Sequence, residues 1–178
     1  MFKKNRVFWI TALVGLVVDR LSKFMILYAF SLPLPPASAS QAELDRVSQT
    51  LLRVIPGVFH FTYALNKGAA FSVFPEGVTW LRWLSLGVSI ALMAWAWSNA
   101  KWERWEQAGF GFILSGAAGN GIDRFVWGYV VDFLDVRLIR FPVFNLADTF
   151  INVGIVCLLI ASFRPTARTN GSSGSDQP

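Results

Sequence analysis

Apolar and polar positions divide the chain into four long apolar segments joined by polar connections. The apolar segments cover residues 7–30, 77–98, 108–124 and 145–163. A helix that crosses the hydrocarbon core of a bilayer needs about 17–25 residues, and all four segments fall within that range. The pattern therefore predicts an all-α membrane protein, a bundle of four transmembrane helices.

The first apolar segment invites comparison with a secretory signal peptide, because it follows the basic leader MFKKNR. A signal peptide has an apolar core of about 7–15 residues and a small-residue cleavage site. Residues 7–30 are longer, contain Asp19, Arg20 and Lys23, and are not promptly followed by such a site. We therefore predict that this segment is retained as a transmembrane helix.

A small β-element is predicted between the first two apolar segments. Residues 31–40 are rich in Pro, Ser and Ala and predict a loop, and residues 41–55 predict a short amphipathic helix. Residues 56–74 contain β-branched and aromatic residues before the turn-forming sequence at 66–68, which is typical of strands. We expect this element on the membrane surface, with His60 as a surface strand residue rather than a metal ligand.

Composition supports a membrane protein and argues against several other classes. Hydrophobic residues make up 54% of the chain and charged residues 15%, whereas soluble domains contain about 25% charged residues. The net charge of +5, with basic residues near the ends of apolar segments, suits contact with membrane lipids. Basic runs with interleaved aromatic residues, which would favour a nucleic-acid partner, are absent. Because no His, Cys and carboxylate cluster has metal-ligand spacing, we expect neither a metal nor a cofactor.

The chain is predicted to form a single membrane-embedded domain, residues 1–163, followed by a polar Gly/Ser-rich tail, residues 164–178, that we expect to be disordered. Four crossings place both ends of the chain on one side of the membrane. Lys and Arg residues near those helix ends make that side cytoplasmic. The connections 31–76 and 125–144 then face outward, and a monomer is expected.

Polar side chains recur at one depth in three of the four predicted helices. With a rise of about 1.5 Å per residue, Asp19 lies about 18 Å above the start of the first helix. By the same measure, Asn120 and Asp123 lie about 18 and 22 Å above the start of the third helix. Asp148 begins the fourth helix at a similar level. Ionisable groups at membrane depth are costly and usually functional, so the coincidence predicts a polar site toward the outer face.

Each polar group also has a structural explanation. Asp19 and Lys23 are four residues apart and can pair along their helix, and the choice between a purely structural pair and a direct role stays open. Asn145 followed three residues later by Asp148 matches a helix N-cap with an acid in the first turn. Taken alone, this pattern favours capping over catalysis. Asp132 taken alone is an ordinary loop acid.

Taken together, Asp132 and Asp148 favour an enzyme. They flank one short connection, with Asn120 and Arg124 close by in the sequence. Neighbouring carboxylates share one proton and divide into acid and base roles, which is what aspartyl hydrolysis requires. Serine catalysis is disfavoured, because the single His lies on a predicted strand and adjacent residues such as Ser22 and Lys23 point to different faces of a helix.

Five short motifs resemble the bacterial lipoprotein signal peptidases, the type II signal peptidases. They are Asp19-Arg20-Leu21-Ser22-Lys23, Asn66-Lys67-Gly68-Ala69-Ala70-Phe71-Ser72, Gly119-Asn120-x-x-Asp123-Arg124, Val130-Val131-Asp132-Phe133 and Phe144-Asn145-Leu146-Ala147-Asp148. Each motif is weak alone, but five in the family's order over residues 7–163 are specific. Residues 31–55 are longer and richer in Pro than the family pattern, and the tail 164–178 is extra.

The resemblance implies an aspartic endopeptidase of the bacterial cytoplasmic membrane, with an active site near the outer face. It would remove the signal peptide from diacylglyceryl-modified prolipoproteins by cutting just before the lipidated lipobox cysteine. Asp132 and Asp148 would be the catalytic pair, and the β-element would hold the substrate backbone. Substrate-binding or supporting roles are implied for Asn66, Gly68, Asn120, Asp123, Arg124, Asn145, Asp19 and Lys23.

Two other classes of protein are compatible with the residues alone. A small transporter also carries intramembrane acids and bases, but it predicts a site near the bilayer midplane and repeated halves. A non-enzymatic assembly factor would use the polar residues as contacts between helices. That second class leaves the pairing of Asp132 with Asp148 without a purpose.

Overall fold

The computed structural model describes residues 5–68, 78–98, 102–139 and 141–163. Most of these residues lie in four long helices: α1 (Arg6–Ala29), α3 (Val78–Trp97), α4 (Arg104–Val126) and α5 (Leu146–Ser162). The remaining elements are α2 (Gln41–Val47), β1 (Gln49–Ile55), β2 (Phe59–Asn66) and β3 (Val130–Val136). The predicted mostly helical fold with a small β-element is confirmed, and each long helix begins and ends within four residues of its predicted segment. The predicted tail and residues 69–74 of the predicted β-element lie outside the described residues.

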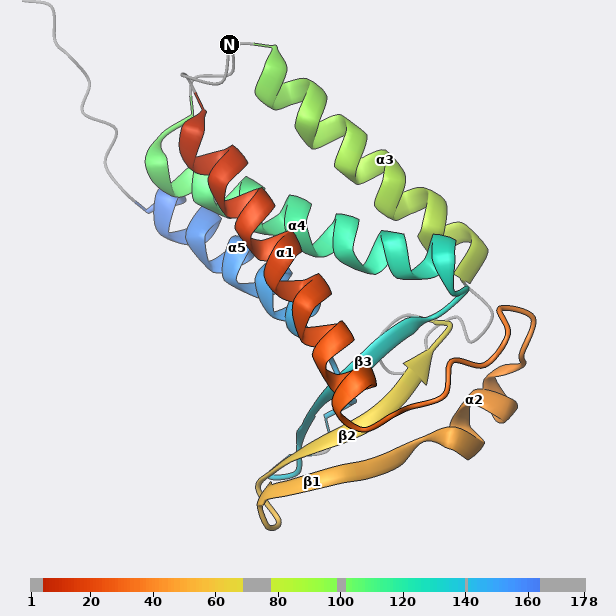
Figure 1. Ribbon diagram of the computed structural model, residues 1–178. Helices are drawn as coiled ribbons and strands as arrows, with labels where there is room; N and C mark the ends of the chain where they lie inside the picture. Colours follow the sequence, from red (N-terminus) through yellow and green to blue (C-terminus); the bar gives the residue numbers. More distant parts are fainter. Residues whose placement is uncertain (1–4, 69–77, 99–101, 140, 164–178) are drawn as a thin grey trace, which may run out of the picture.

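Helix α4 lies at the centre of the long helices and packs against α1, α3 and α5 (Figure 1). Small residues on α4 permit this, because glycine and alanine faces let helix backbones approach closely. A Cβ atom at Gly116 would lie 2.6 Å from the Ile151 side chain and closer still to the carbonyl oxygen of Ala147, both on α5. The small residue at position 116 therefore lets α4 and α5 pack closely.

Gly116→Ala is therefore expected to lower the free energy of unfolding by about 1–3 kcal/mol, because the added methyl group overlaps the backbone of α5. Gly87→Ala on α3 is the matched control, since nothing lies within 4 Å of its would-be Cβ. Thermal unfolding of both variants in detergent measures the difference. Equal unfolding midpoints for the two variants would contradict the close approach of α4 and α5.

The outer faces of the helices are covered with apolar side chains. Met25 of α1 is 69% exposed, Trp83 of α3 is 60% exposed and Val156 of α5 is 53% exposed. Extended apolar surfaces of this kind mark contact with a membrane or a partner. Among the described residues, α3 alone combines the length and apolar composition of a membrane-crossing helix, and α5 is apolar but shorter. The polar groups toward the ends of α1 and α4 lower the hydropathy of those two helices.

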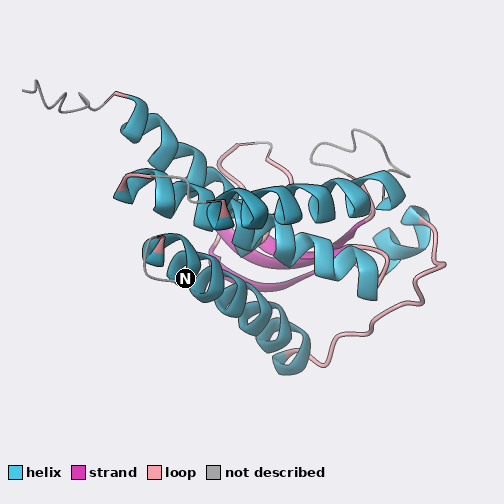
Figure 2. Cartoon of the chain, turned by 90° about the horizontal axis from the view of Figure 1, so that it is seen from above, coloured by secondary structure: helices cyan, strands magenta, loops and turns pink. Residues whose placement is uncertain are grey.

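The three strands form one antiparallel sheet in the order β1-β2-β3, placed at one end of the helices (Figure 1). Figure 2 shows the strands beyond the helices in the view from above. Ala64 of β2 pairs with Asp132 of β3, and Asn66 pairs with Val130. Because alternate residues of a strand share a face, this register points Asn66 and Asp132 to the same side of the sheet.

The expected amphipathic helix over residues 41–55 is wrong in its second half. A reciprocal capping box between Ser40 and Glu43 starts α2, but residues 49–55 form β1. Pairing of β1 with β2 overrides the helical spacing of its apolar residues. The sequence contains strand formers here, yet only the neighbouring strand decides between the two conformations.

The connection 125–144, expected as a loop, contains the third strand. His60 of β2 pairs with Asp135 of β3 and is only 8% exposed, so the expectation of a surface residue is wrong. The strand that covers His60 is distant in the sequence, which is why local patterns did not reveal its burial.

Candidate active site

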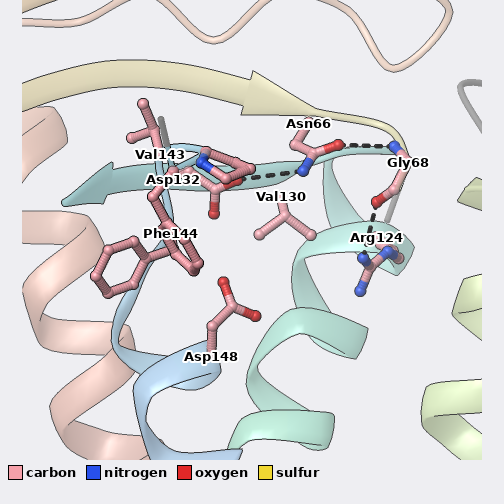
Figure 3. A pocket seen from close by; sticks show the side chains of 10 residues that line it. Asn66, Gly68, Arg124, Val130, Asp132, Val143, Phe144 and Asp148 are labelled. Atoms are coloured by element: carbon pink, nitrogen blue, oxygen red, sulfur yellow. Dashed lines mark hydrogen bonds between the residues drawn. The ribbon is translucent and has the colours of Figure 1, made fainter. Parts of the chain in front are cut away.

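Two carboxyl groups point toward one another across a small cavity where the sheet meets the helices (Figure 3). Asp132 on β3 is 3% exposed, whereas Asp148 in the first turn of α5 is partly exposed. The cavity has a volume of about 80 Å³. One water molecule needs about 10–15 Å³ of such space, so the cavity has room for several. The cavity is lined by Asn66, Gly68, Arg124, Val130, Asp132, Phe141, Pro142, Val143, Phe144 and Asp148.

Two asparagines connect the acids through hydrogen bonds. The Nδ2 of Asn145 donates to Oδ1 of Asp132 at 2.7 Å and to Oδ1 of Asn120 at 3.0 Å. The Nδ2 of Asn120 in turn donates to Oδ1 of Asp148 at 2.7 Å. Each carboxylate therefore accepts from an amide donor, and the chain of amides fixes both the spacing and the orientation of the acids.

Asn145 is also the N-cap of α5. Its Oδ1 accepts from the backbone N–H of Asp148 at 3.0 Å, and Oδ2 of Asp148 accepts from the backbone N–H of Asn145 at 3.3 Å. The capping role expected from the sequence is confirmed. It coexists with the contact to Asp132, because the cap uses the side-chain oxygen of Asn145 and the contact uses the side-chain nitrogen.

Asn66, Gly68 and Arg124 form another wall of the cavity (Figure 3). The Nδ2 of Asn66 donates to Oδ2 of Asp132 at 3.4 Å, and its Oδ1 accepts from the N–H of Gly68 at 2.8 Å. Arg124 donates to the carbonyl oxygen of Gly68 at 3.3 Å, but its buried Nε has no hydrogen-bond partner among the described residues. A buried guanidinium with an unused donor suits a ligand that brings carbonyl oxygens.

The surroundings of Asp132 change its protonation. Burial first, and the nearby Asp148 carboxylate second, raise the pKa of Asp132 well above its usual value. The charge of Lys23 and the hydrogen bonds from Asn145 and Asn66 oppose this rise. Asp132 therefore keeps its proton at pH values at which an isolated Asp has lost it, as an acid–base pair requires.

A second polar cluster lies behind the carboxyl pair and consists of Asp19, Arg20 and Lys23 of α1 with Asp123 of α4. Arg20 contacts Asp19 at 2.7 Å and Asp123 at 2.6 Å. Lys23 contacts the same two acids at 3.1 and 2.6 Å, and the side chains of Asp19, Lys23 and Asp123 are fully buried. Two acids balance two bases, so this buried cluster carries no uncompensated charge.

The buried cluster also holds the candidate active site in place. Oδ1 of Asp19 accepts from the backbone N–H of Ala147 in the first turn of α5 at 3.1 Å, next to Asp148. The Nζ of Lys23 donates to Oδ1 of Asn120 at 3.2 Å. The expected pairing of Asp19 with Lys23 is confirmed, and these contacts between helices favour a supporting role for it.

All ten residues expected at the site lie in these two connected clusters. Sequence reasoning gave Arg20 no role, although its place between Asp19 and Lys23 on α1 was a usable signal. It also gave none to the apolar cavity wall, which consists of Val130, Phe141, Pro142, Val143 and Phe144. An isolated β-bridge between Leu134 and Phe144 brings that wall to the cavity. Such a contact leaves no periodic pattern in the sequence.

Within the described parts of the chain, no group of three or more His, Cys, Asp or Glu residues could hold a metal ion.

The fold is that of a bacterial membrane enzyme. Two solved structures, each described as a bacterial membrane enzyme, match it with TM-scores of 0.70 and 0.67 at 26% and 25% sequence identity. The first match covers 91% of this chain and 90% of the other, and the second covers 89% and 94%.

Residues 11–164 match the sequence model of the family described as signal peptidase (SPase) II, and the chain belongs to this family. The lipoprotein signal peptidase of Microcystis aeruginosa is 55% identical over 94% of this chain and 99% of that protein. The lipoprotein signal peptidase of a Cyanothece species is 57% identical over 91% of this chain and 86% of that protein.

Proposed function

We propose that this protein is an aspartic endopeptidase in which Asp132 and Asp148 are the catalytic pair. Membership of the signal peptidase II family identifies the activity as cleavage of prolipoprotein signal peptides in a bacterial membrane. The observation that carries the aspartic mechanism is the pair of carboxyl groups that face one small cavity with room for water.

The cavity supplies what peptide hydrolysis by two acids requires. One carboxylate accepts a proton from water, and the oxygen of that water attacks the scissile carbonyl carbon. The other carboxyl, still protonated, donates its proton to the carbonyl oxygen. The first carboxyl then passes the proton taken from water to the amide nitrogen, the second takes a proton back from the tetrahedral intermediate, and the C–N bond breaks. The raised pKa of Asp132 supports such proton sharing. Arg124 lines the cavity, where its guanidinium group can hold a carbonyl oxygen of the substrate backbone.

The long helices α1, α3, α4 and α5 are assigned as four membrane crossings, with both termini cytoplasmic and the sheet outside. In Figure 1 the start of α1 and the end of α5 lie at the end of the molecule away from the sheet. The carboxyl pair lies at the sheet end, where water reaches the hydrocarbon boundary. This placement argues against a midplane transport site.

The substrate in this proposal is a diacylglyceryl-modified prolipoprotein, cut just before the lipidated cysteine. Its acyl chains stay in lipid beside the exposed apolar helix faces while the peptide bond reaches the acids. The sheet next to the cavity holds the extended substrate backbone. Both acids and their amide partners come from one chain, so a monomer suffices.

Purified protein in detergent or lipid tests this function. We expect it to release the signal peptide from lipidated prolipoprotein and to leave an unlipidated substrate uncut. A transporter or an assembly factor would cleave neither. Cleavage of both substrates at equal rates would contradict the proposed role of the diacylglyceryl group.

Asn145→Ser should separate capping from catalysis. Serine caps a helix about as well as asparagine, so the stability of α5 should change by only a few tenths of a kcal/mol. Serine cannot span from Asn120 to Asp132 as the Asn145 amide does, so we expect at least a tenfold loss of cleavage rate. Asn145→Ala, which also removes the cap, should lose stability as well. Wild-type activity in the serine variant would show that the amide is needed only for the cap.

A further inference from the structure

One side of β2 lacks a neighbouring strand just where it approaches the active site. Strand β1 pairs with β2 only as far as Tyr63, which lies opposite Gln49. The rest of β2, up to Asn66, has β3 on one side and no described strand on the other. Backbone donors and acceptors on such an edge need other partners.

Gln41 of α2 occupies this gap. Its Nε2 donates to the carbonyl oxygen of Leu65 at 2.8 Å, and its Oε1 accepts from the N–H of Lys67 at 3.0 Å. These two backbone groups lie on either side of Asn66. Gln41 therefore makes the pair of hydrogen bonds that a neighbouring strand would make at this position. A carboxamide satisfies both, because Leu65 offers an acceptor and Lys67 offers a donor. The second Nε2 proton goes to Oδ1 of Asp45 at 2.8 Å, so both protons of the amide are used.

The segment that leads into α2 is itself fastened to the sheet. Tyr63 and Tyr129, both fully buried, donate their hydroxyl groups to the carbonyl oxygens of Pro33 and Pro35. These bonds hold the Pro-rich connection against the sheet, and the capping box then starts α2 at a fixed place. Gln41 therefore approaches β2 from an anchored segment.

We propose that Gln41 is a positioning residue for Asn66, and so for the carboxyl pair. The inference rests on the proposed function, because it acts through Asp132. Asn66 donates to Asp132 and accepts from Gly68, whose carbonyl oxygen accepts from Arg124. Fixing the backbone on both sides of Asn66 thus fixes one wall of the cavity and one hydrogen bond to a catalytic acid.

The pH dependence of cleavage distinguishes positioning from simple structural support. The hydrogen bond from Asn66 lowers the pKa of Asp132. The other charged groups that face Asp132 are Asp148 of α5, Lys23 of α1 and Arg124 of α4, and a change at Gln41 touches none of them directly. Weakening the bond from Asn66 therefore raises the pKa of Asp132, the acid that keeps its proton, and moves the basic limb of the pH–rate profile to higher pH.

Gln41→Met in the full chain tests the proposal, because methionine keeps the length of the side chain and loses both backbone contacts. We expect kcat to fall about tenfold, the equivalent of one or two lost hydrogen bonds, and the basic limb of the pH–rate profile to move to higher pH. Gln41→Glu should behave similarly, since it can still accept from Lys67 but faces the carbonyl oxygen of Leu65 without a proton to donate.

Ser40→Ala is the matched control. It breaks the α2 cap without touching residues 65–67 and should keep the wild-type pH profile.

Wild-type kcat and an unchanged pH profile in Gln41→Met would overturn the positioning role. Equal losses in Gln41→Met and Ser40→Ala without any pH shift would also overturn it, because they would reflect only a loosened α2. Failure of the proposed function is seen separately: it would appear as cleavage that survives in Asp132→Asn, whatever Gln41 does.

Discussion

Asp132→Asn and Asp148→Asn should each reduce cleavage of lipidated prolipoprotein by roughly 10²–10⁴-fold, because general acid–base catalysis contributes about that factor to such reactions. Asparagine keeps the shape of the side chain and an acceptor for the neighbouring amides, but it can neither take a proton from water nor pass one to the substrate. Single-turnover cleavage in detergent measures the loss. Substantial cleavage by either variant would remove the basis of the aspartic mechanism.

Stability measurements on the same variants show whether folding explains the loss. The raised pKa of Asp132 means that the folded protein binds this proton more tightly than the unfolded chain does. Stability contributed by this group is therefore complete below the unfolded pKa of about 4 and falls as pH rises toward the folded-state value. Asp132→Asn removes that fall, so at neutral pH the variant should unfold at or above the wild-type midpoint. A lower midpoint together with lost activity would favour a structural role.

Lys23→Met should destabilise the protein by about 3–5 kcal/mol, because it leaves Asp19 and Asp123 buried with only Arg20 to balance them. For a chain of this size, the change corresponds to a fall in unfolding midpoint of roughly 6–20 °C. Thermal unfolding in detergent measures it. Arg46→Met on α2 is the control, since this exposed cation should change stability by less than about 0.5 kcal/mol.

Charge balance, rather than side-chain volume, should account for this loss. Adding Asp123→Asn to Lys23→Met leaves Asp19 paired with Arg20, so the double variant should be clearly more stable than the sum of the two single changes predicts. Additive losses would mean that the buried charges do not interact. Activity should fall in parallel with stability, because Lys23 also donates to Asn120 and Asp19 holds the first turn of α5.

The sequence predicted the helices well because each helix depends on a local pattern. Apolar runs of helical length gave α1, α3, α4 and α5, with errors confined to the ends. Asp148 and Asn120 were predicted for a different reason, whereas Asp132 lies in a connection and was singled out only by its pairing with Asp148 and by the family resemblance. A carboxyl or amide group within an apolar segment is costly unless it has a partner, so its presence in the sequence already implies a site.

The sheet shows where local patterns fail. Residues 49–55 carry apolar side chains at helical spacing, and they became a strand only because β2 offered a paired edge. Strand β3, the burial of His60 and the cavity wall around Phe144 likewise depend on segments far apart in the chain. No window of sequence contains both partners of such a contact.

The amino-acid sequence by itself determined the membrane class and the positions of the long helices, and it pointed to Asp132 and Asp148 as the candidate acids. It did so because the spacing of apolar residues and the energetic cost of burying a polar group can both be judged from a residue and its neighbours in the sequence. Only the tertiary structure decided that Asp132 and Asp148 face one cavity, that Asn120 and Asn145 link them, and that Gln41 completes the edge of β2. Those outcomes depend on directed hydrogen bonds of about 3 Å between distant segments, and such bonds exist only once the helices and the sheet have packed together.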